Sequence, residues 1–477
     1  MDKKNLHIEK NVYICGEEHH AAQNTVTDCM KQIASILLLS ILLLLPIRIL
    51  GQSGSYEAYL LDAYPHEHEG AVVRHWKDGM VVSTFYGVVP GVMSEWFIGI
   101  HRAHGFLAGS SVNDAFSAYR MPSGLTVNDL FVLGDTAYLC GTEGTHAVYG
   151  WFAIDTAAAT LTLTLTPVYS LDTLRRLVVC RDSTTGKTHL TAIGVYSPES
   201  TNYILEVPDM HASKSQTYSL APVNEAGGRH EETLDDLFLT DDYVVFVSRD
   251  GRDGVGPVCF RYSMPTNVLG STLIDTYYHL SSPPSQIHHA VIGTGTEGNR
   301  FAVAYAATDA ALGSKIHQMD ISGTSGIVLL QSHSTTVCGI EEMAGITYHA
   351  TTGKLTLLWP DIAGYSHFLT FSPYVLGVQA ASHIYPPRVR CTSLDDMGGV
   401  AFVGWGVNGV TMQHTVASLD MCPVVDCMDC HPCEVASFLD SRITSEPAPL
   451  IRQKYTVSSA NASANLYPSY DINVYCD

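Results

Sequence analysis

A pattern of strand, turn and strand repeats along this sequence at intervals of about fifty residues, and it limits the folds open to the chain. The segment Val127-Asn-Asp-Leu-Phe returns as Leu234-Asp-Asp-Leu-Phe, at an offset of 107 residues. Each copy is followed by a turn and then by an apolar strand; the first of these strands includes Gly141 and the second includes Ser248. A related segment, Leu174–Gly194, lies between the two copies and divides the offset into two units.

Further units continue the pattern along most of the chain. They begin near residues 287, 339 and 389, and residues 70–120 contain another. The region 70–420 therefore accommodates about seven units, each of a length typical of a four-stranded propeller blade. Short alternating runs such as Leu161-Thr-Leu-Thr-Leu-Thr indicate strands, and no segment of this region has a sustained helical period.

The sequence thus predicts an all-β fold: a single β-propeller, most simply of seven blades with six as the alternative, followed by a short cysteine-rich C-terminal tail. Apolar residues make up 46% of the chain, which is enough for a sizeable core. Radial stacking buries both faces of each blade, which a lone blade cannot do. A pair of β-sandwiches is the rival architecture, and the regular offset favours the propeller.

The motif at 127–141, Val-x-Asp-Leu followed by Thr-Ala-Tyr-Leu-Cys-Gly, resembles the repeat of exported bacterial β-propeller proteins of unknown function. The resemblance covers most of the chain and implies a propeller fold and an exported protein. It implies no reaction, because the motif is structural. Later units depart from it, since Val-Ser or Gly-Trp replaces Cys-Gly.

An apolar segment near the N-terminus predicts export. Ile33–Leu50 follows Met30-Lys-Gln in the layout of a secretory signal peptide, with cleavage expected between Gly51 and Gln52. Residues 1–29 lack this layout, so we interpret them as a non-native extension upstream of the start. An uncleaved signal anchor is the alternative, although 18 residues are at the short end for a membrane span. We expect the protein in the periplasm, on the outer surface or secreted.

Four segments follow from these observations. Residues 1–29 are the upstream extension, 30–51 the signal peptide, 52–420 the β-propeller and 421–477 the cysteine-rich tail. The net charge of −21, from 26 basic and 47 acidic residues, excludes a general nucleic-acid binder. The expected partner is an unidentified protein or glycan, and the membrane is contacted only if the N-terminal signal segment stays uncleaved.

The tail contains a cluster of cysteines: Cys422, Cys427, Cys430, Cys433 and Cys476. Disulfides are the preferred interpretation in an exported chain. The first four thiols could also hold zinc, and their spacing resembles part of an iron–sulfur run that lacks its completion. Prolines within the cluster disfavour a helix, so we expect a turn-rich loop there and no cofactor.

Other candidate residues are weaker. His66, His68 and His75 form a local cluster that could in principle bind a metal, but short His/Glu tracts are usually solvated loops. His288-His289 and the pair His101 and His104 are assigned no role. Asp129, Asp236 and Glu342 recur at matching positions of three units, and this repetition predicts a structural role in a turn or at the start of a strand.

No familiar catalytic motif is present: the sequence has no Gly-x-Ser-x-Gly, no phosphate loop, no His-Glu-x-x-His and no Ser-x-Asp-x-Gly-x-Thr-Trp repeat. No catalytic residue is therefore assigned. The first hypothesis is a non-catalytic binding or scaffold propeller of the cell envelope or exterior. The alternatives are a propeller enzyme that acts on glycans and a metal or redox protein that uses the cysteine tail.

Overall fold

The computed structural model divides the chain into two compact units, residues 1–53 and 54–477, and every residue described below belongs to the second. The structure describes residues 56–61, 72–77, 80–87, 95–102, 116–182, 184–196, 201–212, 214–222, 232–250, 257–263, 273–278, 287–293, 299–305, 314–321, 327–336, 345–349, 353–360, 366–372, 377–384, 388–396, 400–408, 411–419, 428–438, 443–448, 450–466 and 472–475. The predicted upstream extension and signal peptide lie outside them. No helix in these ranges is long and apolar enough to cross a membrane.

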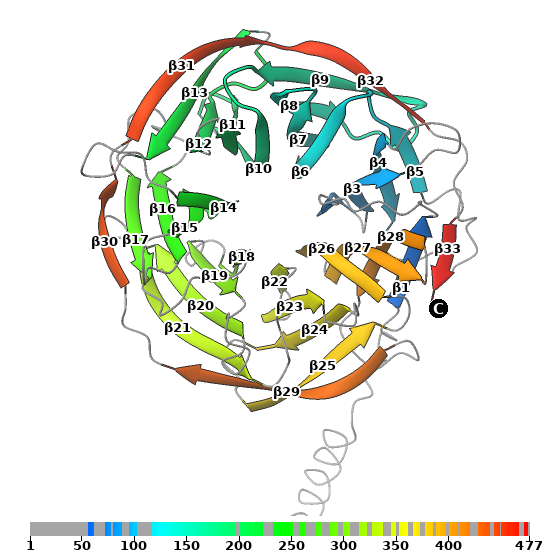
Figure 1. The fold of residues 1–477 in the computed structure, drawn as a ribbon, viewed down its shortest axis with the longest axis vertical. Coiled ribbons are helices and arrows are strands. Elements are labelled where there is room, and N and C mark those ends of the chain that lie inside the picture. Colours follow the sequence, from blue (N-terminus) through cyan, green and yellow to red (C-terminus); the bar gives the residue numbers. More distant parts are fainter. Residues whose placement is uncertain are drawn as a thin grey trace, which may run out of the picture. The chain divides into compact units, whose positions relative to one another are not determined.

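Every regular element in the described ranges is a strand, as the sequence predicted, and the strands form antiparallel runs of four neighbours arranged about a centre (Figure 1). The first strands of these runs are β2 (Val72–His75), β6 (Leu125–Leu133), β10 (Thr173–Arg181), β14 (Glu232–Leu239), β18 (Ile287–Val291), β22 (Gly345–His349) and β26 (Arg388–Asp396). The second strands are β3 (Met80–Gly87), β7 (Thr136–Glu143), β11 (Thr188–Tyr196), β15 (Tyr243–Asp250), β19 (Arg300–Tyr305), β23 (Lys354–Pro360) and β27 (Val400–Asn408).

The third strands are β4 (Glu95–Arg102), β8 (His146–Ala153), β12 (Thr201–Val207), β16 (Pro257–Ser263), β20 (Ser314–Ile321), β24 (Ser366–Phe371) and β28 (Thr411–Leu419). The fourth strands are β5 (Phe116–Arg120), β9 (Thr160–Val168), β13 (Lys214–Pro222), β17 (Leu273–Tyr278), β21 (Ile327–Thr336), β25 (Gly377–Ile384) and β1 (Tyr56–Leu61). The last run is completed from the N-terminal side, because β1 pairs with β28, with Tyr56 opposite Leu419.

The first strands line the centre of the unit and form a closed series. Each contacts the first strand of the next run, and β26 contacts β2. Such a radial series of four-stranded sheets is a propeller-like β fold. It leaves the inner strands facing one another across the centre, where residues from distant units can meet.

The end of the chain forms an outer layer that the sequence did not predict. It consists of five strands, which we call the C-terminal belt: β29 (Met428–Phe438), β30 (Ile443–Ala448), β31 (Leu450–Ser458), β32 (Ala460–Leu466) and β33 (Ile472–Tyr475). Strand β29 pairs with β25 and β21, β30 pairs with β17, and β31 pairs with β13. Strand β32 pairs with β9 and β5, and β33 pairs with β1. The belt therefore runs back around the fold and covers strand edges that would otherwise be open to pairing with other chains.

The belt corrects one expectation about the cysteine cluster. Cys430 and Cys433 lie in strand β29, so the predicted turn-rich loop is wrong at these two positions. Cys430 pairs with Ser382, and Cys433 with Gln379, in the backbone register of β25. Pro432 lies in the same strand, where it supplies a carbonyl but no amide donor.

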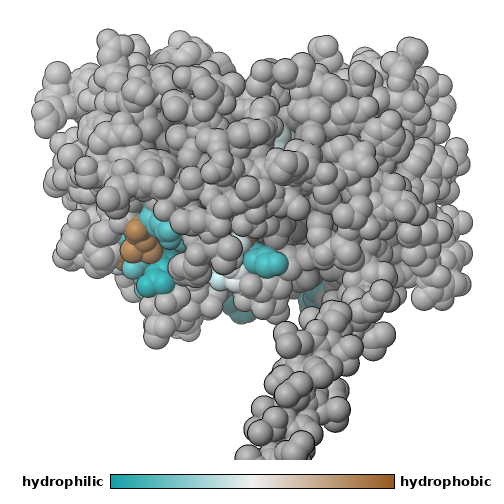
Figure 2. All heavy atoms as spheres, turned by 90° about the horizontal axis from the view of Figure 1, so that it is seen from below, coloured by the Kyte–Doolittle hydropathy of each residue, from teal (hydrophilic) through white to brown (hydrophobic). Residues whose placement is uncertain are grey.

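The core is divided between neighbouring runs. Val82 and Ile98 pack with Leu130 and Leu139 of the next run in one buried cluster. Other clusters join successive runs in the same way, as the propeller model expects. In Figure 2, the described residues visible on one face are mainly hydrophilic, with one small hydrophobic patch among them. The apolar surface of these strands is thus buried mostly between the sheets.

Candidate functional site

A repeated irregularity marks the centre-facing position of the inner strands. In β6, β10, β14 and β26 the pairing with the second strand shifts register by one residue, as in a β-bulge. The residues directly after these shifts are Asp129, Arg176, Asp236 and Ser393. The shift occurs at the same place in these four strands, so the residues that follow it occupy equivalent positions of their runs.

The pairing register identifies the equivalent residues of the other inner strands. Asp129 lies opposite Cys140 and Asp236 opposite Val247, and each partner is followed by a small residue. By the same criterion β2 contributes Arg74 and β18 contributes His289. No described residue of the remaining strand, β22, meets this criterion; we include its first residue, Gly345, because it lines the same central space. We call the set the inner ring: Arg74, Asp129, Arg176, Asp236, His289, Gly345 and Ser393.

One sequence-based interpretation needs correction here. Asp129 and Asp236 lie within inner strands at a bulge, and not in turns or at strand starts. Glu342, the third recurring acid, lies outside the described residues. Asp129 and Asp236 do occupy equivalent positions of their runs, directly after the register shift of the inner strand.

Asp129 joins three inner strands through one buried carboxylate, which is 2% exposed. Its Oδ1 accepts hydrogen bonds from Nη2 of Arg74 at 2.8 Å and from the backbone N of Leu130 at 2.9 Å. Its Oδ2 accepts from the backbone N of Leu177 at 3.0 Å. Arg74 also donates from Nε to the carbonyl of Leu130. Both carboxylate oxygens are therefore engaged by neighbouring runs.

Asp236 repeats this arrangement with different partners. Its Oδ2 lies 2.6 Å from Nδ1 of His289, and its Oδ1 accepts from the backbone N of Leu237 at 2.9 Å. Nε of Arg176 lies 3.9 Å from Oδ1. Burial acts to raise the pKa of Asp236, but the charge and hydrogen bond of His289, with the charge of Arg176, lower it to about 2. Phe238 stacks on His289 at 4.2 Å and fixes its ring.

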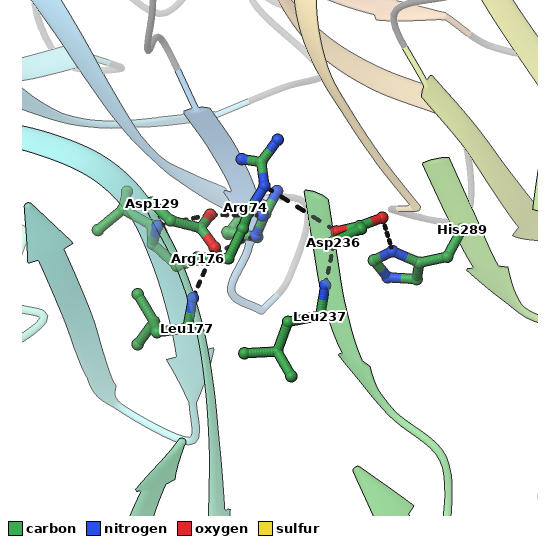
Figure 3. A network of polar contacts seen from close by, with 8 residues as sticks. Arg74, Asp129, Arg176, Leu177, Asp236, Leu237 and His289 are labelled. Carbon is green, nitrogen blue, oxygen red and sulfur yellow. Dashed lines mark hydrogen bonds and ion pairs between the residues drawn. The ribbon is translucent and has the colours of Figure 1, made fainter. Parts of the chain in front are cut away.

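Basic and acidic side chains alternate along five members of the inner ring, from Arg74 through Asp129, Arg176 and Asp236 to His289. In Figure 3 the two arginine side chains lie between the two aspartates, and His289 follows at the far side of Asp236. The alternation ends at Gly345, which has no side chain. The ring is therefore asymmetric, with a charged sector and a sector that begins with glycine.

The inner ring opens into a central cavity of about 440 Å³. Its lining includes all the ring residues from β2 to β22, together with His75, His288, Thr347 and Tyr348. The volume lies within the range of about 300–1,000 Å³ that small-molecule sites occupy. This cavity is the candidate functional site, and of its residues only His75 had been considered for a binding role, as a weak metal ligand, from sequence.

The two cysteines whose side chains the structure describes, Cys140 and Cys180, are not in disulfides. Burial, with the nearby charge of Asp129, raises the pKa of Cys140 well above its usual range. Burial and the charge of Asp182 raise the pKa of Cys180 to about 12. Raised pKa values disfavour the reactive thiolate, so neither cysteine is suited to redox chemistry or metal binding.

The other predicted site residues are only partly covered by the structure. His75 lines the central cavity, whereas its predicted companions His66 and His68 lie outside the described residues. Cys422, Cys427 and Cys476 also lie outside them, and only the backbone of Cys430 and Cys433 is described. Within the described ranges no group of three His, Cys, Asp or Glu side chains is placed to hold a metal ion.

Neither a protein-family model nor a curated protein matches this chain. Among solved structures, a chain of "Crystal Structure of Mitotic Checkpoint Complex" is similar at 9% identity and a TM-score of 0.40, over 76% of this chain and 91% of that chain. Trypanosoma rangeli sialidase is similar at 8% identity and a TM-score of 0.30, over 75% of this chain and 55% of the sialidase. A mutant of that sialidase with trans-sialidase activity gives a TM-score of 0.28 at 9% identity, over 75% of this chain and 57% of the mutant. Similarities this low carry no argument about the site.

Proposed function

We propose that this chain is an exported, non-catalytic, seven-bladed β-propeller that binds a protein or glycan ligand, or acts as a scaffold, in the cell envelope or exterior. Export rests on the signal-peptide layout of Met30–Leu50. The seven blades rest on the seven inner strands, each of which begins a run of four and contacts the next in a closed series. The C-terminal belt adds an outer strand to these blades, and disulfides among its cysteines remain part of the proposal.

The engagement of both cavity carboxylates carries the non-catalytic assignment. Glycoside hydrolysis needs one protonated carboxyl group as the general acid, beside a second carboxylate. Asp236 is ionised across the ordinary pH range because its pKa is lowered to about 2. Asp129 has both oxygens committed to Arg74 and to two backbone amides. Neither group is arranged to donate a proton to a leaving group.

A glycan-processing enzyme is the second candidate, favoured by the asymmetry of the inner ring. A catalytic site needs a set of side chains that occurs once in the fold, rather than once in every run. The inner ring has such a set, because two carboxylates lie on one side of it and a glycine on the other. The enzyme would require a further acid from outside the ring pairs. The third candidate, a metal or redox protein, depends on the side chains of the tail cysteines.

Hydrolysis assays on a panel of chromogenic glycosides test the proposal. We expect no turnover above that of a heat-treated sample. Hydrolysis by the native protein that is lost in Asp236→Asn, while Asp135→Asn retains it, would establish the enzyme instead. Asp135 is the matched control because it is an exposed aspartate, in the turn between β6 and β7, outside the cavity lining.

A further inference from the structure

Strand β32 of the C-terminal belt contains the sequence Asn461-Ala462-Ser463. Asparagine followed by any residue except proline, and then by serine or threonine, is the acceptor sequence of N-linked glycosylation in exported chains. No other asparagine of the chain has serine or threonine two positions after it. The chain therefore offers a single position to this modification.

The alternation of side chains along β32 places the acceptor groups on its accessible face. Ala464 belongs to the buried cluster that joins the first two runs, and Ala462 packs against it. Asn461 and Ser463 lie on the opposite face of the strand, and both are exposed. The amide and the hydroxyl that the acceptor sequence requires are therefore not part of the core.

The surroundings of Asn461 are compatible with a sugar. Oγ1 of Thr164 donates a hydrogen bond to Oδ1 of Asn461 at 3.4 Å. A glycan is attached to Nδ2, so Oδ1 remains an acceptor for Thr164 after the modification. Exposed, uncharged side chains lie on the same face, namely Thr160, Thr162 and Asn465. A sugar can lie against these hydroxyl and amide groups without burying a charge.

Attachment has to precede the docking of the belt. In the folded protein β32 pairs with β9 from Ala460 to Asn465, so its backbone is already occupied. In the sequence, however, β32 follows all seven runs. During export this segment emerges after its partner β9 and is unpaired until the belt docks, which gives a transferase access to it.

We infer that Asn461 is the attachment site of an N-linked glycan, added during export. The reaction needs a membrane-bound transferase and, as donor, an oligosaccharide linked to a lipid diphosphate. Nδ2 of Asn461 forms a bond to the anomeric carbon of the donor sugar and releases one proton. The bond from that carbon to the diphosphate oxygen breaks, and the lipid diphosphate leaves with the electron pair. The inference rests on the proposed export of the chain and adds a modification to it.

A glycan at Asn461 leaves the central cavity accessible. Strand β32 pairs with the fourth strands β9 and β5 at the outer rim of the fold, whereas the first strands line the centre (Figure 1). The glycan therefore covers the outer part of the second run, and the inner ring stays open to a ligand.

The test expresses the full chain, with its own signal segment, in a eukaryotic secretory host. The mass of the secreted protein is measured before and after treatment with a peptide-N-glycosidase. We expect the mass to fall, because this enzyme releases the glycan and converts the asparagine that carried it to aspartate. Peptide mass spectrometry should find that conversion at Asn461 and at no other asparagine.

Two substitutions of Ser463 separate the acceptor sequence from the mere presence of an exposed amide. Ser463→Ala keeps Asn461 but removes the required hydroxyl, so the mass difference should be lost. Ser463→Thr restores a hydroxyl and should retain the mass difference. Asn461→Gln should lose it. Since attachment precedes docking of the belt, total cell protein gives the same comparison for a variant that is not secreted.

Asn465→Gln is the matched control. Asn465 is exposed on the same face of β32 and accepts a hydrogen bond from Thr160, as Asn461 does from Thr164. It has no serine or threonine two positions after it, so this variant should keep the glycan. A glycan that persists in Asn461→Gln or Ser463→Ala, or that is lost in Asn465→Gln, would overturn the inference.

The inference and the proposed export fail in different ways. A secreted chain that begins near Gln52 but carries no glycan refutes only the modification at Asn461. A chain that stays inside the cell with its signal segment intact and without a glycan refutes the proposed export, and the inference fails with it.

Discussion

Removing the carboxylate of Asp129 should destabilise the protein far more than removing an exposed aspartate that links the same two runs. Asp129→Ala deletes the acceptor for Arg74, Leu130 and Leu177 at once. Each donor left unsatisfied in a buried site costs about 1–3 kcal/mol, and breaking a buried ion pair costs about 3–5 kcal/mol in all. We therefore expect the free energy of unfolding to fall by about 3–5 kcal/mol.

The matched control is Asp135→Ala. Asp135 lies 2.6 Å from Nζ of Lys77 and accepts a hydrogen bond from Trp76, so it also joins the first run to the second. Its side chain is 68% exposed, and that of Lys77 is 49% exposed. Water replaces such contacts readily, so this variant should unfold nearly as the native protein does.

Equilibrium urea denaturation, followed by tryptophan fluorescence, compares the two variants with the native protein. The expected result is a large fall in the midpoint for Asp129→Ala and a small one for Asp135→Ala. Equal midpoints for the two variants would refute the reasoning, since the buried carboxylate would then hold the inner strands no better than a surface contact does.

Three further outcomes follow from the same structure. Since the pKa of Asp236 is about 2 when folded and ordinarily 3.8, its ionised form stabilises the fold above about pH 4, and this contribution is lost as the pH falls toward 2. Denaturation at stepped pH should show this loss in the native protein and a shallower one in Asp236→Asn. Deleting residues 428–477 exposes the outer edges, so gel filtration should show oligomers or aggregates, whereas deleting only residues 472–477 should preserve the monomer peak better. Gly141→Ala should lower the melting temperature markedly, because the added Cβ would overlap the carbonyl oxygen of Thr126, and an unchanged value would contradict that close approach.

The repeat motif predicted the inner strands well because its residues serve local needs. Val127 and Leu130 are buried apolar positions, and Gly141 permits close approach of the paired strand. These demands recur in each unit, so they leave similar residues at similar spacing. The sequence therefore predicted that the described elements are strands, and their regular spacing predicted the propeller-like arrangement.

The inner ring could not be read in the same way, because it arises between units. Arg74 meets Asp129 from a strand 55 positions away, and the equivalent of Asp129 in the next unit is the oppositely charged Arg176. A search for recurring residues finds the two aspartates but misses their partners. When acidic and basic residues alternate at equivalent positions, no residue type recurs from one unit to the next, although the ion pairs between them join successive strands.

The C-terminal belt was missed for a different reason. Strand β32, Ala460–Leu466, is composed mainly of Ala, Asn and Ser, which have little preference for strands. Its antiparallel pairing with β9 places Asn461 opposite Thr164, whose hydroxyl also donates to the Asn461 side chain. Backbone pairing at an open edge demands little of the side chains, so the sequence of such a strand resembles a loop or tail.

The most direct test of the account is the ionisation of Asp236 in the folded protein. Carbon-13 NMR of protein labelled at the aspartate carboxyl carbons, with Asp236→Asn to assign the signal, gives its titration midpoint. A midpoint near pH 2 would agree with a carboxylate that His289 and Arg176 hold ionised, as a structural member of the inner ring. A midpoint well above the ordinary value of 3.8 would contradict the account, because a carboxyl group that keeps its proton could serve as a general acid.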